Sequence, residues 1–103
     1  MPKGYVILTE AINDPGGMAA YGRAAGLSLA ESGGSVLALD ANPQLLEGSW
    51  HGDQTVVLEF ESVEAARAWY ESAAYEKAKP LRQAAAETNA VIVSGFVMPA
   101  VSE

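Results

Sequence analysis

Half of the aromatic side chains in this sequence lie within one short segment. Phe60, Trp69, Tyr70 and Tyr75 are four of the eight aromatic residues, and they fall within sixteen positions. Because Trp69 and Tyr70 are adjacent, they leave a helix about 100° apart and cannot both face the same core. We therefore expect one of them to pack inward while the other lines a cleft and offers a π-face and a hydroxyl to a ligand. The alternative is ordinary packing in a core or a dimer interface, with the hydroxyls bonded locally.

The positive charges gather in the same part of the sequence. Four of the six Lys and Arg residues lie between positions 67 and 82, namely Arg67, Lys77, Lys79 and Arg82. In an otherwise acidic chain such a group can hold a carboxylate or a phosphate, or Arg82 can pair with Glu59 across a pocket. The alternative is a solvated helix face on which these cations pair with glutamates one helical turn away.

Glu59 and His51 are two further polar candidates. If the strand parity of Glu59 faces a dimer interior, Glu59 is a partly buried carboxylate, and otherwise it is a strand-end residue in water. His51 is the only histidine and lies in sequence between Glu47 and Asp53, so a general base or a weak metal site is conceivable. One histidine with loop carboxylates does not match the ligand sets of zinc sites, so we expect no metal.

Local signals in the sequence predict the elements that must position these residues. Asp14 and Pro15 begin a helix that Gly33 and Gly34 end, because Asp caps helices, Pro suits the first turn and Gly suits the end. Ser62 can cap a second helix, Ser72 can restart it, and Pro80 should kink it or begin a new turn. Apolar and β-branched runs predict strands at about 4–12, at 36–39 with a ragged continuation to 46, at 55–60 and at 91–97. The order β-α-β-β-α-β favours an α+β, ferredoxin-like domain, with a four-stranded antiparallel sheet and two helices on one face.

The predicted strands carry apolar side chains on both faces. In an antiparallel sheet with one face in water, alternate residues should be polar, yet Val6 and Leu8 alternate with Tyr5 and Ile7. Two helices can cover only one face, and the other face would be an apolar patch of a size that soluble monomers rarely expose. We therefore expect a homodimer packed sheet against sheet. The alternative is a sheet that is covered by its own loops and tail.

Length, charge and composition exclude several classes of protein. The 103 residues fit one domain over 1–103, with its core at about 4–97. The net charge of −7 argues against a nucleic-acid partner, because phosphate binding needs clustered Lys and Arg. No apolar run reaches the roughly 20 residues of a membrane-spanning helix, and the N-terminus lacks the pattern of a secretory signal. The absence of cysteine is compatible with a cytoplasmic location. The glycine spacing forms neither of the common nucleotide-binding motifs, and we expect no cofactor.

One long motif resembles a known family. The sequence reads Ala66-x-x-Trp69-Tyr70-x-Ser72-x-x-Tyr75, followed by Arg82 and then Gly95. This pattern resembles the small bacterial proteins grouped as domain of unknown function 1330, and the resemblance spans about residues 4–97. Where relatives often carry proline after Trp50, this chain has His51-Gly52. The resemblance implies the dimeric α+β barrel superfamily, in which two four-stranded sheets close face to face. That superfamily includes cofactor-independent monooxygenases, dehydratases, lactone isomerases and haem-dependent enzymes, but the resemblance implies no established activity for this family itself.

Two hypotheses of different classes follow from the sequence. The first is a cytoplasmic homodimer that binds a small organic acid or an aromatic molecule in a cleft between its helices and its sheet, without binding nucleic acid or membrane. Its expected ligand-binding residues are Tyr21, Trp69, Tyr70, Tyr75 and Arg82. If it is an enzyme, which the sequence leaves open, we expect cofactor-independent proton transfer or oxygenation, with Tyr70, Arg82 and Glu59 as the catalytic candidates. The second hypothesis is a non-catalytic interaction module whose only specific surface is the dimer face. A pocket with convergent polar groups would favour the first.

Overall fold

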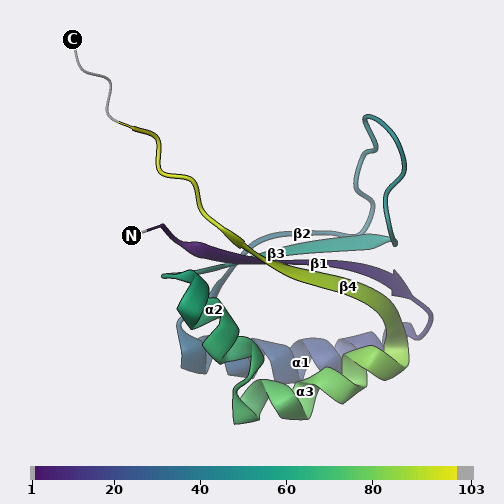
Figure 1. Ribbon diagram of the computed structural model, residues 1–103. Helices are drawn as coiled ribbons and strands as arrows, with labels where there is room; N and C mark the ends of the chain where they lie inside the picture. Colours follow the sequence, from purple (N-terminus) through teal and green to yellow (C-terminus); the bar gives the residue numbers. More distant parts are fainter. Residues whose placement is uncertain (1, 100–103) are drawn as a thin grey trace.

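The computed structural model describes residues 2–99, which alternate between strands and helices (Figure 1). The elements are, in order, β1 (Gly4–Ile12), α1 (Pro15–Ser32), β2 (Ser35–Asp40), β3 (Gln54–Phe60), α2 (Val63–Tyr70), α3 (Ala73–Ala85) and β4 (Ala86–Ser94). The predicted order is confirmed, and the second helical region is divided into α2 and α3 where Ser72 restarts the helix.

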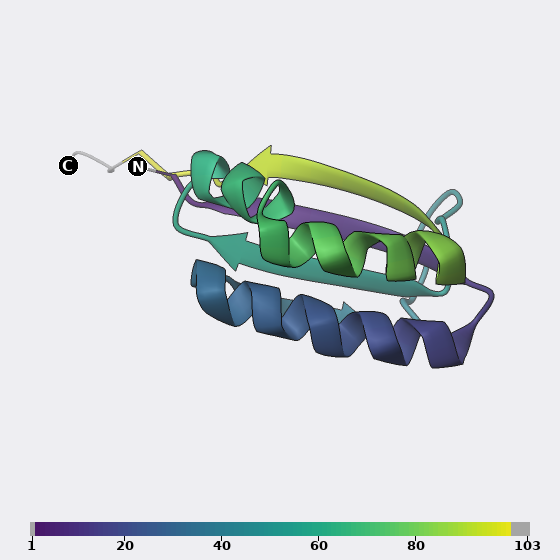
Figure 2. The same cartoon turned by 90° about the horizontal axis from the view of Figure 1, so that it is seen from below.

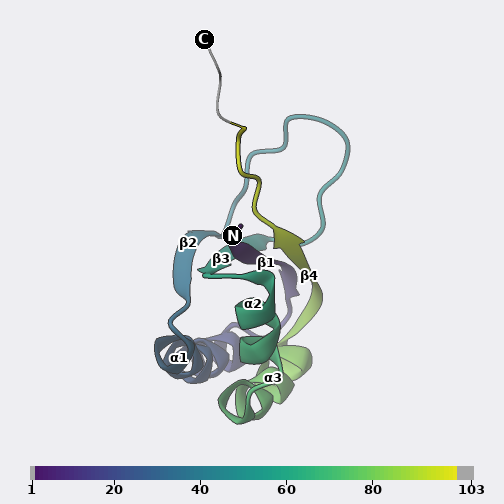
Figure 3. The same ribbon diagram turned by 60° about the vertical axis from the view of Figure 1, so that its left-hand side comes forward.

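The four strands form one antiparallel sheet in the order β2-β3-β1-β4. The helices lie together on one face of this sheet, with α1 beside α3 (Figures 1 and 2). The loop between β2 and β3 and residues 95–99 rise from the opposite face (Figure 3). This is the ferredoxin-like α+β arrangement that the sequence predicts.

Each helix begins at a capping side chain that the sequence supplies. Asp14, Ser62 and Ser72 each accept a hydrogen bond from the backbone N–H three residues later, at 3.1, 3.0 and 3.2 Å. Such caps satisfy backbone donors that have no partner within the helix. Gly33 ends α1 with a φ of 72°, a left-handed conformation that glycine adopts without steric cost.

Two strands have bounds that differ from the sequence-based expectations, and Pro80 does not divide its helix. β2 ends at Asp40 instead of continuing to Leu46, because the Asp40 side chain accepts a hydrogen bond from the Asn42 N–H and turns the chain. Pro80 lies inside α3 without ending it, since α3 packs along its length against α1 and this packing offsets the roughly 3 kcal/mol that an interior proline costs. β4 spans Ala86–Ser94 instead of 91–97, because its polar first half pairs with the end of β1.

The core lies between the sheet and the helices. Val6 and Leu8 of β1, with Leu58 and Phe60 of β3, point towards the helices and are nearly inaccessible to water. Trp69 fills the centre: its ring lies 4.1 Å from that of Tyr75 and 5.4 Å from that of Phe60, measured between centroids. Its indole N–H donates to the Ser28 hydroxyl at 2.9 Å, so the one polar group of this buried side chain is satisfied.

An apolar row of side chains crosses the face of the sheet that carries no helix. The strand register aligns Ala38, Val57, Ile7 and Val91 in one row across all four strands. Val57 and Ile7 are half-buried by their neighbours, whereas Val91 is 52% exposed. Within residues 2–99 the helices therefore leave this apolar row on the other face of the sheet uncovered.

Candidate functional site

A cleft with a volume of about 600 Å³ lies between α1 and the sheet. Its walls are mainly apolar side chains of β1, β2, β3 and α1, namely Leu8, Ile12, Met18, Ala25, Leu29, Val36, Leu39, Val56 and Leu58. Gly22 and Gly26 of α1 also border it, and a Cβ atom at either position would have no neighbour within 4 Å. The cleft therefore stays open on its helix side because α1 carries small residues there. Its size and apolar walls are typical of small-molecule sites.

The polar groups of the cleft gather around Glu10 of β1. Glu10 is only 1% exposed although it carries a carboxylate, and its Oε1 accepts a hydrogen bond of 2.8 Å from the Gln54 side chain. Both residues line the cleft, as does Asp53, whose backbone N–H donates to the Glu10 carbonyl at 2.9 Å. Gly52 makes this close contact with β1 feasible: it has a φ of 82°, and a Cβ there would lie 2.5 Å from Glu10 backbone atoms.

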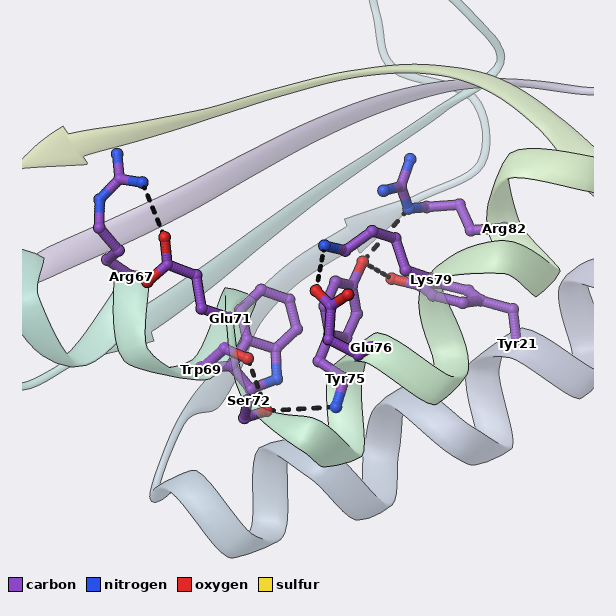
Figure 4. A network of polar contacts seen from close by, with 9 residues as sticks. All are labelled: Tyr21, Arg67, Trp69, Glu71, Ser72, Tyr75, Glu76, Lys79 and Arg82. Carbon is purple, nitrogen blue, oxygen red and sulfur yellow. Dashed lines mark hydrogen bonds and ion pairs between the residues drawn. The ribbon is translucent and has the colours of Figure 1, made fainter.

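A buried hydrogen-bonded chain joins α1 to α3 beside the cleft (Figure 4). The hydroxyls of Tyr21 and Tyr75 are 2.8 Å apart, and the Arg82 Nε–H donates to the Tyr75 oxygen at 3.2 Å. Tyr75 is inaccessible and Arg82 is 4% exposed. Among residues 2–99 no carboxylate lies within 4 Å of the Arg82 guanidinium, and the side-chain hydrogen bond of this buried cation goes to the Tyr75 oxygen.

Burial and charge set the protonation states of this chain. Burial raises the pKa of Tyr21 well above its usual value; the nearby Tyr75 and Glu10 raise it further, while Arg82 lowers it. Burial alone would lower the pKa of Arg82, but the phenol oxygens of Tyr75, Tyr21 and Tyr70 outweigh burial and raise it. Tyr21 is therefore a neutral hydroxyl, and Arg82 a cation, at physiological pH.

The raised pKa of Tyr21 predicts a loss of stability in alkali. Above about pH 10 the unfolded chain releases the proton of the Tyr21 hydroxyl, whereas the folded chain keeps it. The free energy of unfolding therefore falls as the pH rises. The contribution of Tyr21 to this slope is at most about 1.4 kcal/mol per pH unit. Urea unfolding at about pH 9 and about pH 11 measures the slope. Tyr21→Phe should reduce it, and an unchanged slope in that variant would contradict the assignment.

The structure brings four of the five expected ligand-binding residues to one region. Tyr21 and Trp69 line the cleft, and Tyr75 and Arg82 lie directly behind Tyr21. Tyr70 lies away from the cleft lining: its ring packs against Trp69 and Tyr75, at centroid distances of 6.3 and 5.5 Å. The sequence led us to expect that one of these two adjacent aromatic residues packs inward and the other lines the cleft. In the structure Trp69 does both, and Tyr70 is not among the lining residues.

The other charged candidates lie apart from the cleft. Glu59 is on the helix-free face, where its carboxylate accepts a hydrogen bond of 3.0 Å from the Tyr5 hydroxyl, and this bond raises the pKa of Tyr5. Lys79 lies 4.0 Å from the centre of the Tyr70 ring and pairs with Glu76, and this pairing raises its pKa. Arg67 pairs with a glutamate one turn later, so it belongs to a solvated helix face.

His51 joins strands on the helix-free face. Its Nδ1 lies 2.8 Å from the Thr9 hydroxyl and its Nε2 lies 3.3 Å from the Glu87 carboxylate. These contacts fasten the loop between β2 and β3 to β1 and β4. Within residues 2–99 no three His, Asp or Glu side chains form a group suited to a metal ion.

The sequence patterns considered above do not single out Glu10 and Gln54. A signal was present, because Glu10 has the same strand parity as the inward-facing Val6 and Leu8, and Gln54 has the parity of Val56. A polar side chain at an inward position of an apolar strand marks a core polar group or a site.

Comparisons with known proteins agree with this fold. The family described as domain of unknown function (DUF1330) matches residues 3–96. A protein of unknown function from Rhodopseudomonas palustris superposes with a TM-score of 0.74 at 22% identity, covering 94% of this chain and 85% of that one. SnoaB, a cofactor-independent oxygenase from Streptomyces nogalater, superposes with a TM-score of 0.67 at 9% identity over the whole of both chains.

A dimeric ferredoxin-like protein of unknown function from Thermobifida fusca superposes with a TM-score of 0.55 at 16% identity, covering 90% of this chain and 91% of that one. At these identities the likeness concerns the fold alone. No curated protein matches the chain in sequence. Among the helices of residues 2–99, none is long and apolar enough to cross a membrane.

Proposed function

The chain belongs to the DUF1330 family of domains of unknown function, and on this premise we propose that it is a homodimer that binds a small organic molecule in the cleft between α1 and the sheet. The observation that carries this proposal is the cleft itself, with about 600 Å³ of space, apolar walls and a few polar groups at one end. A module with only a dimerisation surface would be expected to fill this space with side chains.

The uncovered sheet face supports the homodimer. Packing two such faces against each other would remove the apolar row across the four strands from water. The dimeric description of the ferredoxin-like neighbour supports the same arrangement. Glu59 and Tyr5 would then lie at or near the interface between the subunits, since both are on this face.

If the bound molecule is also transformed, we propose cofactor-independent proton transfer or oxygenation. SnoaB, whose fold this chain shares, is described as a cofactor-independent oxygenase. The polar residues that line the cleft are Tyr21, which is backed by Tyr75 and Arg82, and Glu10, Asp53 and Gln54. A cytoplasmic location stays a prediction.

Filling the cleft from α1 tests the binding proposal. Gly26→Leu adds a side chain where a Cβ meets no atom within 4 Å, and leucine improves the helix propensity, so the variant should fold. We expect at least a tenfold loss of affinity for an apolar probe such as 2-ethylnaphthalene, measured by equilibrium dialysis.

The matched control is Ala30→Leu, an exposed position of the same helix that does not line the cleft. It should bind the probe as the unchanged protein does. Equal binding by both variants would mean that the probe binds elsewhere, and no binding by the unchanged protein would refute the proposed cleft function.

A further inference from the structure

The direction of the hydrogen bonds beside the cleft indicates which group meets a ligand. An Arg Nε–H is always a donor, so the Tyr75 oxygen must accept from Arg82. Tyr75 has one hydroxyl proton of its own, and in residues 2–99 its only other hydrogen-bonding neighbour is the Tyr21 oxygen at 2.8 Å. If Tyr21 were the donor to Tyr75, the proton of the fully buried Tyr75 would have no acceptor, which is costly.

The favoured order is therefore Arg82 to Tyr75 to Tyr21, each group donating to the next. In this order the proton of the Tyr21 hydroxyl is not used within the chain. Tyr21 lines the cleft, whereas Tyr75 and Arg82 lie behind it. Hydrogen bonds in a chain polarise one another, so the Arg82 charge acts through Tyr75 on the Tyr21 hydroxyl. The cleft lining thus includes a hydroxyl donor whose proton has no partner within this chain of groups.

The charges of the cleft determine which acceptor this donor suits. The charged side chains among its described lining residues are Glu10 and Asp53, both carboxylates, and no Lys or Arg lines it. A ligand carboxylate in the cleft would be repelled by the buried Glu10 carboxylate and, more weakly, by the exposed Asp53. Of the two ligand classes predicted from the sequence, organic acids and aromatic molecules, the first is therefore disfavoured. A neutral oxygen acceptor avoids the repulsion.

We infer that the cleft binds an apolar, uncharged carbonyl compound, with the Tyr21 hydroxyl donating a hydrogen bond to the carbonyl oxygen. The inference rests on the proposed function, since it names the ligand class of the same cleft. Trp69, at the inner wall, favours an aromatic ring on the ligand. In this arrangement Tyr21 is a binding residue, and Tyr75 and Arg82 are positioning residues that act through it.

Three probes of nearly equal shape test the inference by equilibrium dialysis: 2-acetylnaphthalene, 2-ethylnaphthalene and 2-naphthoate. We expect the ketone to bind roughly tenfold more tightly than the hydrocarbon and the carboxylate to bind most weakly. Tyr21→Phe should bring the ratio of the affinities for ketone and hydrocarbon close to one, and circular dichroism should show that the variant is folded. Tyr70→Phe, whose hydroxyl does not line the cleft, should keep the preference.

Carbonyl infrared spectroscopy of bound 2-acetylnaphthalene supplies a readout that needs no variant. A hydrogen bond from Tyr21 should move the carbonyl stretch to lower frequency than in an apolar solvent. Equal affinities for ketone and hydrocarbon, an unshifted stretch, a preference that survives Tyr21→Phe, or tightest binding of the carboxylate would each overturn the inference while leaving the cleft function intact. If none of the three probes binds, the proposed function fails and the inference fails with it.

Discussion

Val91→Glu is expected to convert the protein from a dimer to a monomer at micromolar concentration. Val91 lies in the apolar row that crosses the helix-free face, beside Ile7 of the neighbouring strand. In a sheet-to-sheet dimer a glutamate at this position would be buried without a partner, a cost of several kcal/mol. We expect the dimer dissociation constant to rise at least about a hundredfold, measured by sedimentation equilibrium.

Leu27→Glu provides the matched control for this experiment. Leu27 is 71% exposed on α1, on the helix side of the molecule, so a charge there should leave the dimer intact. Circular dichroism should show both variants folded, since neither site belongs to the buried core. If Val91→Glu stays dimeric, or if the unchanged protein sediments as a monomer, the helix-free face is not the interface.

The fold was predictable because its signals are local. The caps at Asp14, Ser62 and Ser72 mark the helix starts, and alternating apolar residues mark the strands. Pro80 shows the limit of such signals, because the packing of α3 against α1 overrides a local rule. Register and helix packing involve residues far apart in the sequence, and a local pattern does not encode them.

The candidate site was predictable only in part for the same reason. The family motif singles out Tyr75 and Arg82, but the contact of Tyr75 with Tyr21 joins residues that are 54 positions apart. It depends on α1 lying beside α3, which no spacing within either helix specifies. Glu10 was not predicted because the clustered aromatic and basic residues lie in α2 and α3, whereas a single carboxylate in a strand is evident only from its parity.

Gly22 and Gly26 connect the stability of α1 to the cleft. Each lowers the stability of the helix by roughly 1 kcal/mol relative to alanine. Neither is required by close packing in this chain, because a Cβ at either position would meet no atom within 4 Å. Both border the cleft, so their effect is to keep space between α1 and the sheet. The two glycines thus lower the stability of α1 and leave the cleft open, which is consistent with a binding role for the cleft.

Tyr75→Phe is expected to destabilise the folded protein by about 2 kcal/mol or more. The change removes one oxygen, but that oxygen accepts from the Arg82 guanidinium and contacts the Tyr21 hydroxyl in a buried region. Leaving a buried cationic donor without its acceptor costs more than losing a neutral hydrogen bond. Urea unfolding at neutral pH measures the difference in the free energy of unfolding.

Tyr70→Phe is the matched control, because it removes the same atom from a half-buried tyrosine whose hydroxyl makes no side-chain hydrogen bond within residues 2–99. It should cost less than about 0.5 kcal/mol. Arg82→Met in the Tyr75→Phe background should then recover part of the lost stability, since it removes the buried charge that lacks its acceptor. If the two tyrosine variants are equally stable, the Arg82–Tyr75 contact contributes nothing to the stability of the fold. The inferred order of donation, from Arg82 to Tyr75 to Tyr21, would then have no support.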